Sequence, residues 1–107
     1  MSGKPPLTRQ GTKYFHRTSL SPDAVIRRAA GYFSPALAPV EEGLRRRRFS
    51  GALGQLSVIV ESEGGHYTRV TVETNQPGES ELDRRAKRFL AVVHADAEPG
   101  HLLRGAY

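Results

Sequence analysis

The chain contains no cysteine and no tryptophan. The absence of cysteine excludes disulfide bonds, thiol catalysis and cysteine-ligated metal sites, and it fits a reducing compartment. No apolar run approaches the roughly 20 residues that a membrane-spanning helix needs. The first residues are basic but lack the apolar stretch of a signal peptide. We therefore expect a cytoplasmic protein without a membrane span.

Motifs of catalysis and cofactor binding are missing too. The sequence has no phosphate-binding loop, no dinucleotide-binding fingerprint, no HExxH motif and no nucleophile elbow. Glu61 and Glu73 are expected on the outer face of a sheet, where they form no convergent acidic pair. We therefore expect no metal and no cofactor, and we favour a non-catalytic role over an enzyme. The histidines, which lack metal-ligand spacing, are His16, His66, His94 and His101.

Charge and length bound the remaining possibilities. Sixteen Lys and Arg stand against eleven Asp and Glu, which gives a net charge of +5, and a basic protein attracts polyanions without specificity. A chain of 107 residues fits one domain. We expect a disordered basic tail over residues 1–12, a single α+β domain over 13–95 and a C-terminal tail over 96–107.

The segment Gly78 to Ala95 predicts an amphipathic helix that closes a small sheet. Ser80 suits the N-cap, and Asp83 stands where a capping-box acid reaches back to it. The basic residues on the opposite side form either a solvated helix face or a docking stripe. The apolar residues that recur at helical spacing and predict one buried face are Leu82, Ala86, Phe89, Leu90 and Val93.

The N-terminal half predicts a strand followed by a short helix. Residues Lys13 to Leu20 form the candidate strand, with Phe15 as its buried anchor. Ser21 is a plausible N-cap, and Pro22 suits the first helical position. The next segment, Ser34 to Glu42, carries two prolines and no helical period, so it predicts a loop.

Three strands are predicted after this loop. Gly43 to Ser50 contains four consecutive arginines. They indicate either a sheet edge whose charge prevents pairing with other chains or a patch that binds nucleic acid. Gln55 to Glu61 and His66 to Thr74 predict a hairpin. We expect Ser62 to pair with His66, because this register places the apolar residues of both strands on one face.

The register of the preceding hairpin follows from the same reasoning. Pairing of Ser50 with Gln55 places Phe49 on the inner face and Arg47 beside Val58. Arg47 then either extends to water at the sheet edge or lines a groove between sheet and helix. In the groove it would contact an anionic ligand or an acidic partner.

These elements predict an α+β fold, with an antiparallel sheet of about four strands in the order strand, helix, three strands, helix. The segments LSPDAVIRRAAGYF and GGHYTRVTVETNQPGESELDRRAKRFLAVV cover less than half of the chain. They resemble the first strand-to-helix passage and the closing strand and helix of START-related proteins and polyketide cyclases. The resemblance implies a helix-grip domain of reduced size and transfers no catalytic residue. The TATA-binding-protein-like fold has a similar element order and stays an alternative.

The resemblance implies a small binding module, whose concave side between sheet and closing helix either holds an apolar or amphipathic ligand or is simply a filled core. In this hypothesis Arg47 is the polar anchor. The predicted lining residues are Phe33, Leu37, Val58, Val70, Phe89 and Leu90.

Two other hypotheses depend on surfaces. In the first, a basic domain contacts nucleic acid or the ribosome through phosphates. Tyr67 is predicted on the outer face without a second ring, which disfavours sequence-specific RNA recognition. In the second, a protein partner completes an exposed sheet edge. The predicted phosphate contacts are Arg45, Arg46, Arg47, Arg48, Arg84, Lys87 and Arg88.

Overall fold

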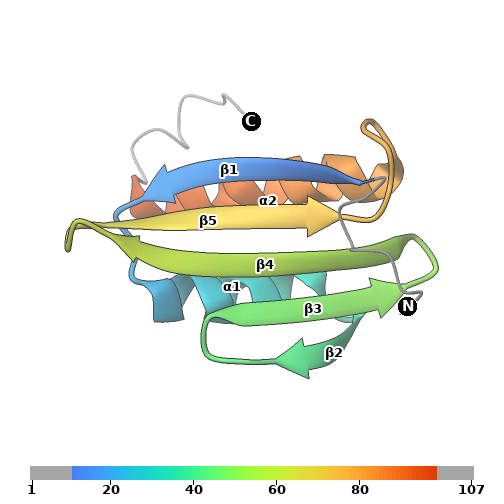
Figure 1. Cartoon of the computed structure of the whole chain (residues 1–107), viewed down its shortest axis with the longest axis horizontal. Coiled ribbons are helices and arrows are strands. Elements are labelled where there is room, and N and C mark those ends of the chain that lie inside the picture. Colours follow the sequence, from blue (N-terminus) through green and yellow to red (C-terminus); the bar gives the residue numbers. More distant parts are fainter. Residues whose placement is uncertain (1–10, 99–107) are drawn as a thin grey trace, which may run out of the picture.

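The computed structural model describes residues 11–98, and these form a five-stranded antiparallel sheet with two helices on one face (Figure 1). The predicted α+β class is confirmed, with one strand more than expected. The tails predicted at both ends fall mainly on residues 1–10 and 99–107, which lie outside the described part. The elements in chain order are β1 (Thr12–Thr18), α1 (Pro22–Phe33), β2 (Ala38–Glu42), β3 (Arg46–Gly51), β4 (Gly54–Glu63), β5 (Tyr67–Thr74) and α2 (Glu81–Ala97).

The strand order in the sheet is β1-β5-β4-β3-β2. Strands β2 to β5 form a meander, and β1 pairs with β5, so β1 and β2 are the two edges. The prediction of a loop over Ser34 to Glu42 is wrong in the second half of this segment, which forms β2. This strand is held by its pairing with β3, where Glu41 lies opposite Arg48. The edge predicted at the four arginines is also wrong, because β3 lies between β2 and β4.

One hairpin register is confirmed and the other is shifted. Ser50 pairs with Gln55, as expected. Ser62 pairs with Thr68 rather than with the predicted His66. A shift of two residues leaves every side chain on its predicted face, so face selection alone cannot detect it.

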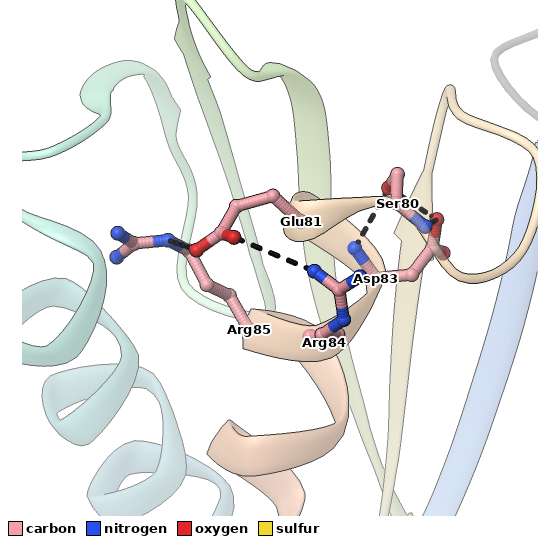
Figure 2. Close-up of polar contacts among 5 residues, drawn as sticks. All are labelled: Ser80, Glu81, Asp83, Arg84 and Arg85. Atoms are coloured by element: carbon pink, nitrogen blue, oxygen red, sulfur yellow. Dashed lines mark hydrogen bonds and ion pairs between the residues drawn. The ribbon is translucent and has the colours of Figure 1, made fainter.

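The helices begin where their caps predict. The Ser21 hydroxyl accepts a hydrogen bond from the Ala24 amide at 3.1 Å, and α1 follows directly. The Ser80 hydroxyl accepts from the Asp83 amide at 3.0 Å, which completes one half of a capping box (Figure 2). Helix α1 packs on β3 and β4, and α2 packs on β1 and β5. Both helices therefore cover the same face of the sheet (Figure 1). We call the other face, which no helix covers within residues 11–98, the helix-free face.

An aromatic cluster occupies the centre of the core between sheet and helices. The ring of Phe33 lies 5.1 Å from that of Phe89 and 5.3 Å from that of Phe49, measured between centroids. The predicted inner face of α2 is confirmed, although Leu90 is only partly buried. Its fully buried residues are Leu82, Ala86, Phe89 and Val93.

Phe15 does not anchor this core, contrary to the prediction. Its side chain is 58% exposed on the helix-free face of the sheet. Side chains alternate along a strand, so Phe15 shares its face with Lys13 and Arg17. Tyr14 and His16 take the inner side instead, where Tyr14 packs against the core.

Candidate functional site

The residues predicted to line an apolar pocket lie in the core. Phe33, Leu37, Val58, Val70 and Phe89 are each 1% exposed or less. They belong to one cluster, and Leu90 packs against its margin. Because these side chains contact one another, a packing role explains them without a bound ligand.

Arg47 lies at the margin of the same layer. Its Nε donates a hydrogen bond of 3.4 Å to the carbonyl of Gly43 in the turn before β3. It pairs across the sheet with Val58 on one side and with Glu42 on the other. The structure therefore gives this arginine a local role in the turn.

The four consecutive arginines are divided between the two faces of the sheet. Arg46 and Arg48 point to the helix-free face, and Arg45 and Arg47 to the opposite side, because side chains alternate along β3. Arg45 lies 3.7 Å from Asp23, and Arg48 lies 3.5 Å from a carboxylate oxygen of Glu41. The run is therefore no single basic patch.

The basic residues of α2 form a separate group. Glu81 lies 3.5 Å from Arg84 and 3.4 Å from Arg85, so one carboxylate serves two guanidinium groups (Figure 2). Lys87 lies over the ring of Tyr14 at 5.7 Å, and Arg88 is exposed. Helix α2 packs on β1 and β5, and β4 separates these strands from β3. The predicted phosphate contacts are thus not brought together.

The charge of the folded part is nearly balanced. Residues 11–98 contain thirteen Lys and Arg and eleven Asp and Glu, a net charge of +2. The remaining excess comes from Lys4, Arg9 and Arg104, which lie outside the described residues. Net charge therefore gives little reason to expect polyanion binding by the folded domain itself.

The helix-free face carries two exposed aromatic rings, each beside an arginine. Phe15 is 58% exposed and Tyr67 is 49% exposed. The guanidinium carbon of Arg69 lies 5.9 Å from the centroid of the Phe15 ring, and that of Arg17 lies 5.4 Å from the Tyr67 centroid. Both distances fall within the range of cation–π attraction.

One carboxylate joins these two aromatic–arginine pairs. Arg17 and Arg69 are direct neighbours across β1 and β5, and Glu63 lies 3.1 Å from the Nε of Arg17 and 3.4 Å from that of Arg69. We call Phe15, Arg17, Glu63, Tyr67 and Arg69 the aromatic–arginine surface. It extends over β1, β5 and the end of β4.

The charges on the whole helix-free face nearly cancel. Lys13 lies 3.6 Å from Glu73, whose side chain is almost fully buried beneath the surface. Partly buried Ile59 adds apolar area at the centre. By the strand registers, the cations on this face are Lys13, Arg17, Arg46, Arg48 and Arg69, and the carboxylates are Glu41, Glu61, Glu63 and Glu73.

A buried polar network lies on the other side of the sheet. One oxygen of Asp83 accepts hydrogen bonds from Tyr14 and Thr74, both at 2.9 Å, and the other accepts from the Ser80 hydroxyl at 2.5 Å. Burial raises the pKa of the Asp83 carboxyl, but the hydrogen bonds outweigh it and hold the pKa below its ordinary value. The network joins β1, β5 and α2, so we assign it a structural role.

Two histidines meet between β1 and α2. The rings of His16 and His94 lie 5.7 Å apart in an edge-to-face arrangement. Burial, followed by repulsion from His94, lowers the pKa of His16. The buried Nε2 of His16 finds no hydrogen-bond partner within residues 11–98. The folded chain therefore favours the neutral form of His16 at this contact between β1 and α2.

A shallow depression of about 220 Å³ opens at the end of the sheet where β1 leads into α1. Ser19, Ser62 and His66 contribute polar groups to its lining. Thr68 donates a hydrogen bond of 2.7 Å to the carbonyl of Leu20, which fixes one wall. The depression shares Tyr67 with the aromatic–arginine surface, so the two adjoin at this residue.

Neither a cluster of metal-ligating side chains nor a membrane-spanning helix occurs in the part of the chain that the structure describes. Within residues 11–98 no three His, Asp or Glu side chains gather as metal ligands. Neither α1 nor α2 is long and apolar enough to cross a membrane.

No family model matches the chain, and neither a curated protein nor a solved structure matches it.

The sequence analysis placed Phe15 in the core and named neither Arg17 nor Arg69 as a site residue. The sequence did indicate the exposure of Phe15. Side chains two residues apart in a strand lie on the same face, so Phe15 shares its face with Lys13 and Arg17. Two charged neighbours on one face outweigh one aromatic residue as an indication of exposure.

Proposed function

We propose that this chain is a non-catalytic protein-binding domain that uses the helix-free face of its sheet. The observation that carries the proposal is the exposure of Phe15 and Tyr67 side by side with Arg17 and Arg69. Antiparallel sheets commonly leave one face in water, and that face is then polar. Exposed aromatic rings with arginine are instead enriched at protein interfaces and among their strongest contacts.

The charge distribution supports a protein partner over a nucleic acid. Arg17, Arg48 and Arg69 of this face are already paired with carboxylates, and a phosphate would have to approach those carboxylates. One observation favours the nucleic-acid alternative: Phe15 supplies a second ring on the face of Tyr67, and paired rings can stack on bases. Single-stranded RNA is therefore the second candidate partner.

The helix-grip resemblance forms a further part of the proposal. The order strand, helix, four strands, helix supports it. The contacts among Phe33, Phe49 and Phe89 favour a filled interior, so we place binding on the surface.

Photo-crosslinking tests the proposal. Benzoylphenylalanine replaces Phe15 or Tyr67, and Leu44, which is 83% exposed in the turn between β2 and β3, serves as the control position. We expect a discrete protein adduct from positions 15 and 67 in extract of the source cells, and none from position 44. An equal adduct from all three positions, or none from any, would contradict the proposal.

The second candidate has its own measurement. Fluorescence anisotropy of a labelled single-stranded RNA reports binding across a salt titration. Micromolar binding that weakens steeply as salt rises indicates that arginines neutralise phosphates. That result, together with a ribonuclease-sensitive adduct at position 15, would replace the protein partner by RNA.

A further inference from the structure

We infer that β1 accepts an extended, acidic segment of a partner protein as an additional strand of the sheet. The inference rests on the proposed function and adds the class of partner. Strand β1 pairs with β5 through seven consecutive residues without a bulge, and it contains neither proline nor glycine. In the described part of the chain β5 is its only strand neighbour. Strand β1 forms one edge of the sheet (Figure 1), so the backbone groups along its outer side have no strand partner within residues 11–98.

The opposite edge is poorly suited to the same role. Strand β2 has five residues and contains Pro39, which has no N–H to donate. Its pairing with β3 shifts register between Pro39 and Glu41. Prolines and bulges are the devices with which proteins prevent pairing at an edge. Of the two edges, only β1 lacks them.

Cations line the free edge of β1 on both faces of the sheet. Lys13 and Arg17 project on the helix-free face with side chains 48% and 64% exposed. Lys87 of α2 lies over the Tyr14 ring on the other face. The carboxylates that pair with Lys13 and Arg17 come from β5 and β4, on the side away from the edge. An added strand would therefore meet the cations first.

The side chains of β1 define the sequence pattern of the partner. Phe15 lies midway between Lys13 and Arg17 on the same face. Opposite charges and paired apolar side chains stabilise neighbouring strands. The best partner segment therefore alternates acidic, apolar and acidic residues at every second position.

A second copy of this chain fits less well. Antiparallel pairing of two β1 strands centred on Phe15 would place Lys13 of each copy opposite Arg17 of the other, and like charges in that position destabilise the pair. Strand β2 of another copy offers Glu41 and Glu42, but Pro39 and the bulge interrupt its edge.

The test is a titration of the ¹⁵N-labelled full chain with acetyl-Thr-Glu-Thr-Val-Thr-Glu-Thr-amide, followed by NMR. We expect saturable shifts that concentrate on the amides of β1 and on Lys87. The same peptide with lysine in place of glutamate should produce none. A version N-methylated at alternate residues should bind about tenfold more weakly, because it cannot form the ladder of backbone hydrogen bonds.

Two variants of equal charge test the role of the cations. Lys13→Gln with Arg17→Gln should weaken binding about fivefold, as expected for two exposed ion pairs. Arg27→Gln with Arg45→Gln removes two exposed cations on the other side of the sheet and should leave the affinity unchanged. Circular dichroism of both variants confirms that the fold is retained.

Several results would overturn the inference. These are equal binding of the lysine peptide, undiminished binding of the N-methylated peptide, or shifts centred away from β1. Sedimentation equilibrium tests whether the chain associates with itself. If it does, and if the double variant Glu41→Gln with Glu42→Gln abolishes this association, the edge of β1 binds a second copy instead. If the peptide fails while position 15 still crosslinks to a protein, strand addition is wrong and the protein-binding function stands. If crosslinking fails as well, both are wrong.

Discussion

Arg17 and Arg69 lie directly opposite each other across the pairing of β1 with β5. Like charges in this arrangement destabilise a sheet. Glu63 compensates, because its carboxylate lies within 3.4 Å of the Nε of both arginines. Within residues 11–98, Glu63 is therefore the carboxylate that contacts both arginines, whereas Glu61 lies 3.8 Å from Arg69 alone.

Replacement of this acid should have a measurable cost. We expect Glu63→Gln to lower the free energy of unfolding by about 1 kcal/mol, since it removes two partly exposed ion pairs and leaves two arginines in repulsion. The loss should grow at low salt, where screening is weaker. Urea denaturation measures it, with Glu42→Gln on exposed β2 as the control. Equal losses in both variants would show that Glu63 has no bridging role.

The two phenylalanines that the sequence analysis placed inside should respond differently. Phe89→Ala should lower the free energy of unfolding by about 3–5 kcal/mol, because Phe89 is fully buried. Phe15→Ala should change it by about 0.5 kcal/mol or less, as is usual for surface positions. Thermal and urea unfolding of both variants provide the comparison. A small loss for Phe89→Ala would contradict its place in the core.

The Asp83 network should be sensitive to loss of one carboxylate oxygen. Asp83→Asn places an amide NH₂ where an oxygen now accepts hydrogen bonds, so buried donors lose their partner. We expect a loss of about 1–3 kcal/mol, the usual cost of an unsatisfied buried polar group. Glu81→Gln, an exposed acid in the same helical turn, should cost about 0.5 kcal/mol or less. Chemical denaturation distinguishes the two, and equal effects would refute a structural role for the network.

Stability should fall with acid in two stages. The pKa of His16 in the folded chain lies below 6.5, its ordinary value. As the pH falls below about 6.5, the imidazole is therefore protonated in the unfolded chain before it is protonated in the folded one, and stability declines. The pKa of Asp83 lies below 3.8, so its contribution is present above that pH and is lost as the pH falls through the folded pKa. Urea midpoints measured across this range record both stages.

His16→Phe separates the two stages. The variant removes the titrating group and retains an aromatic ring beside His94. Its stability should stay level until the carboxylates titrate. A decline near pH 6 that persists in this variant would assign the first stage to another group.

Features set by neighbouring residues could be predicted from the sequence. Both helix starts follow from caps within four residues, at Ser21 and Ser80, and both are confirmed. The pairing of Ser50 with Gln55 is also confirmed, because a two-residue turn leaves little freedom of register. In each case the contacts that decide the structure lie within a few residues.

Features set by distant contacts could not be predicted in the same way. Strand β2 has two acidic residues and a proline, and only its pairing with the arginines of β3 makes it a strand. The site was harder still. The proximity of Phe15 and Arg69 depends on the pairing of β1 with β5, which no local pattern encodes.

That pairing also determines when the surface can exist. Strand β1 leaves the ribosome first among the strands, and its partner β5 leaves last, with most of the domain between them. A chain cut short before β5 contains Phe15 and Arg17 but has neither Tyr67 nor Arg69 to place beside them. A partner that recognises this surface therefore binds chains in which β5 has been made and paired with β1, and not shorter nascent or truncated ones.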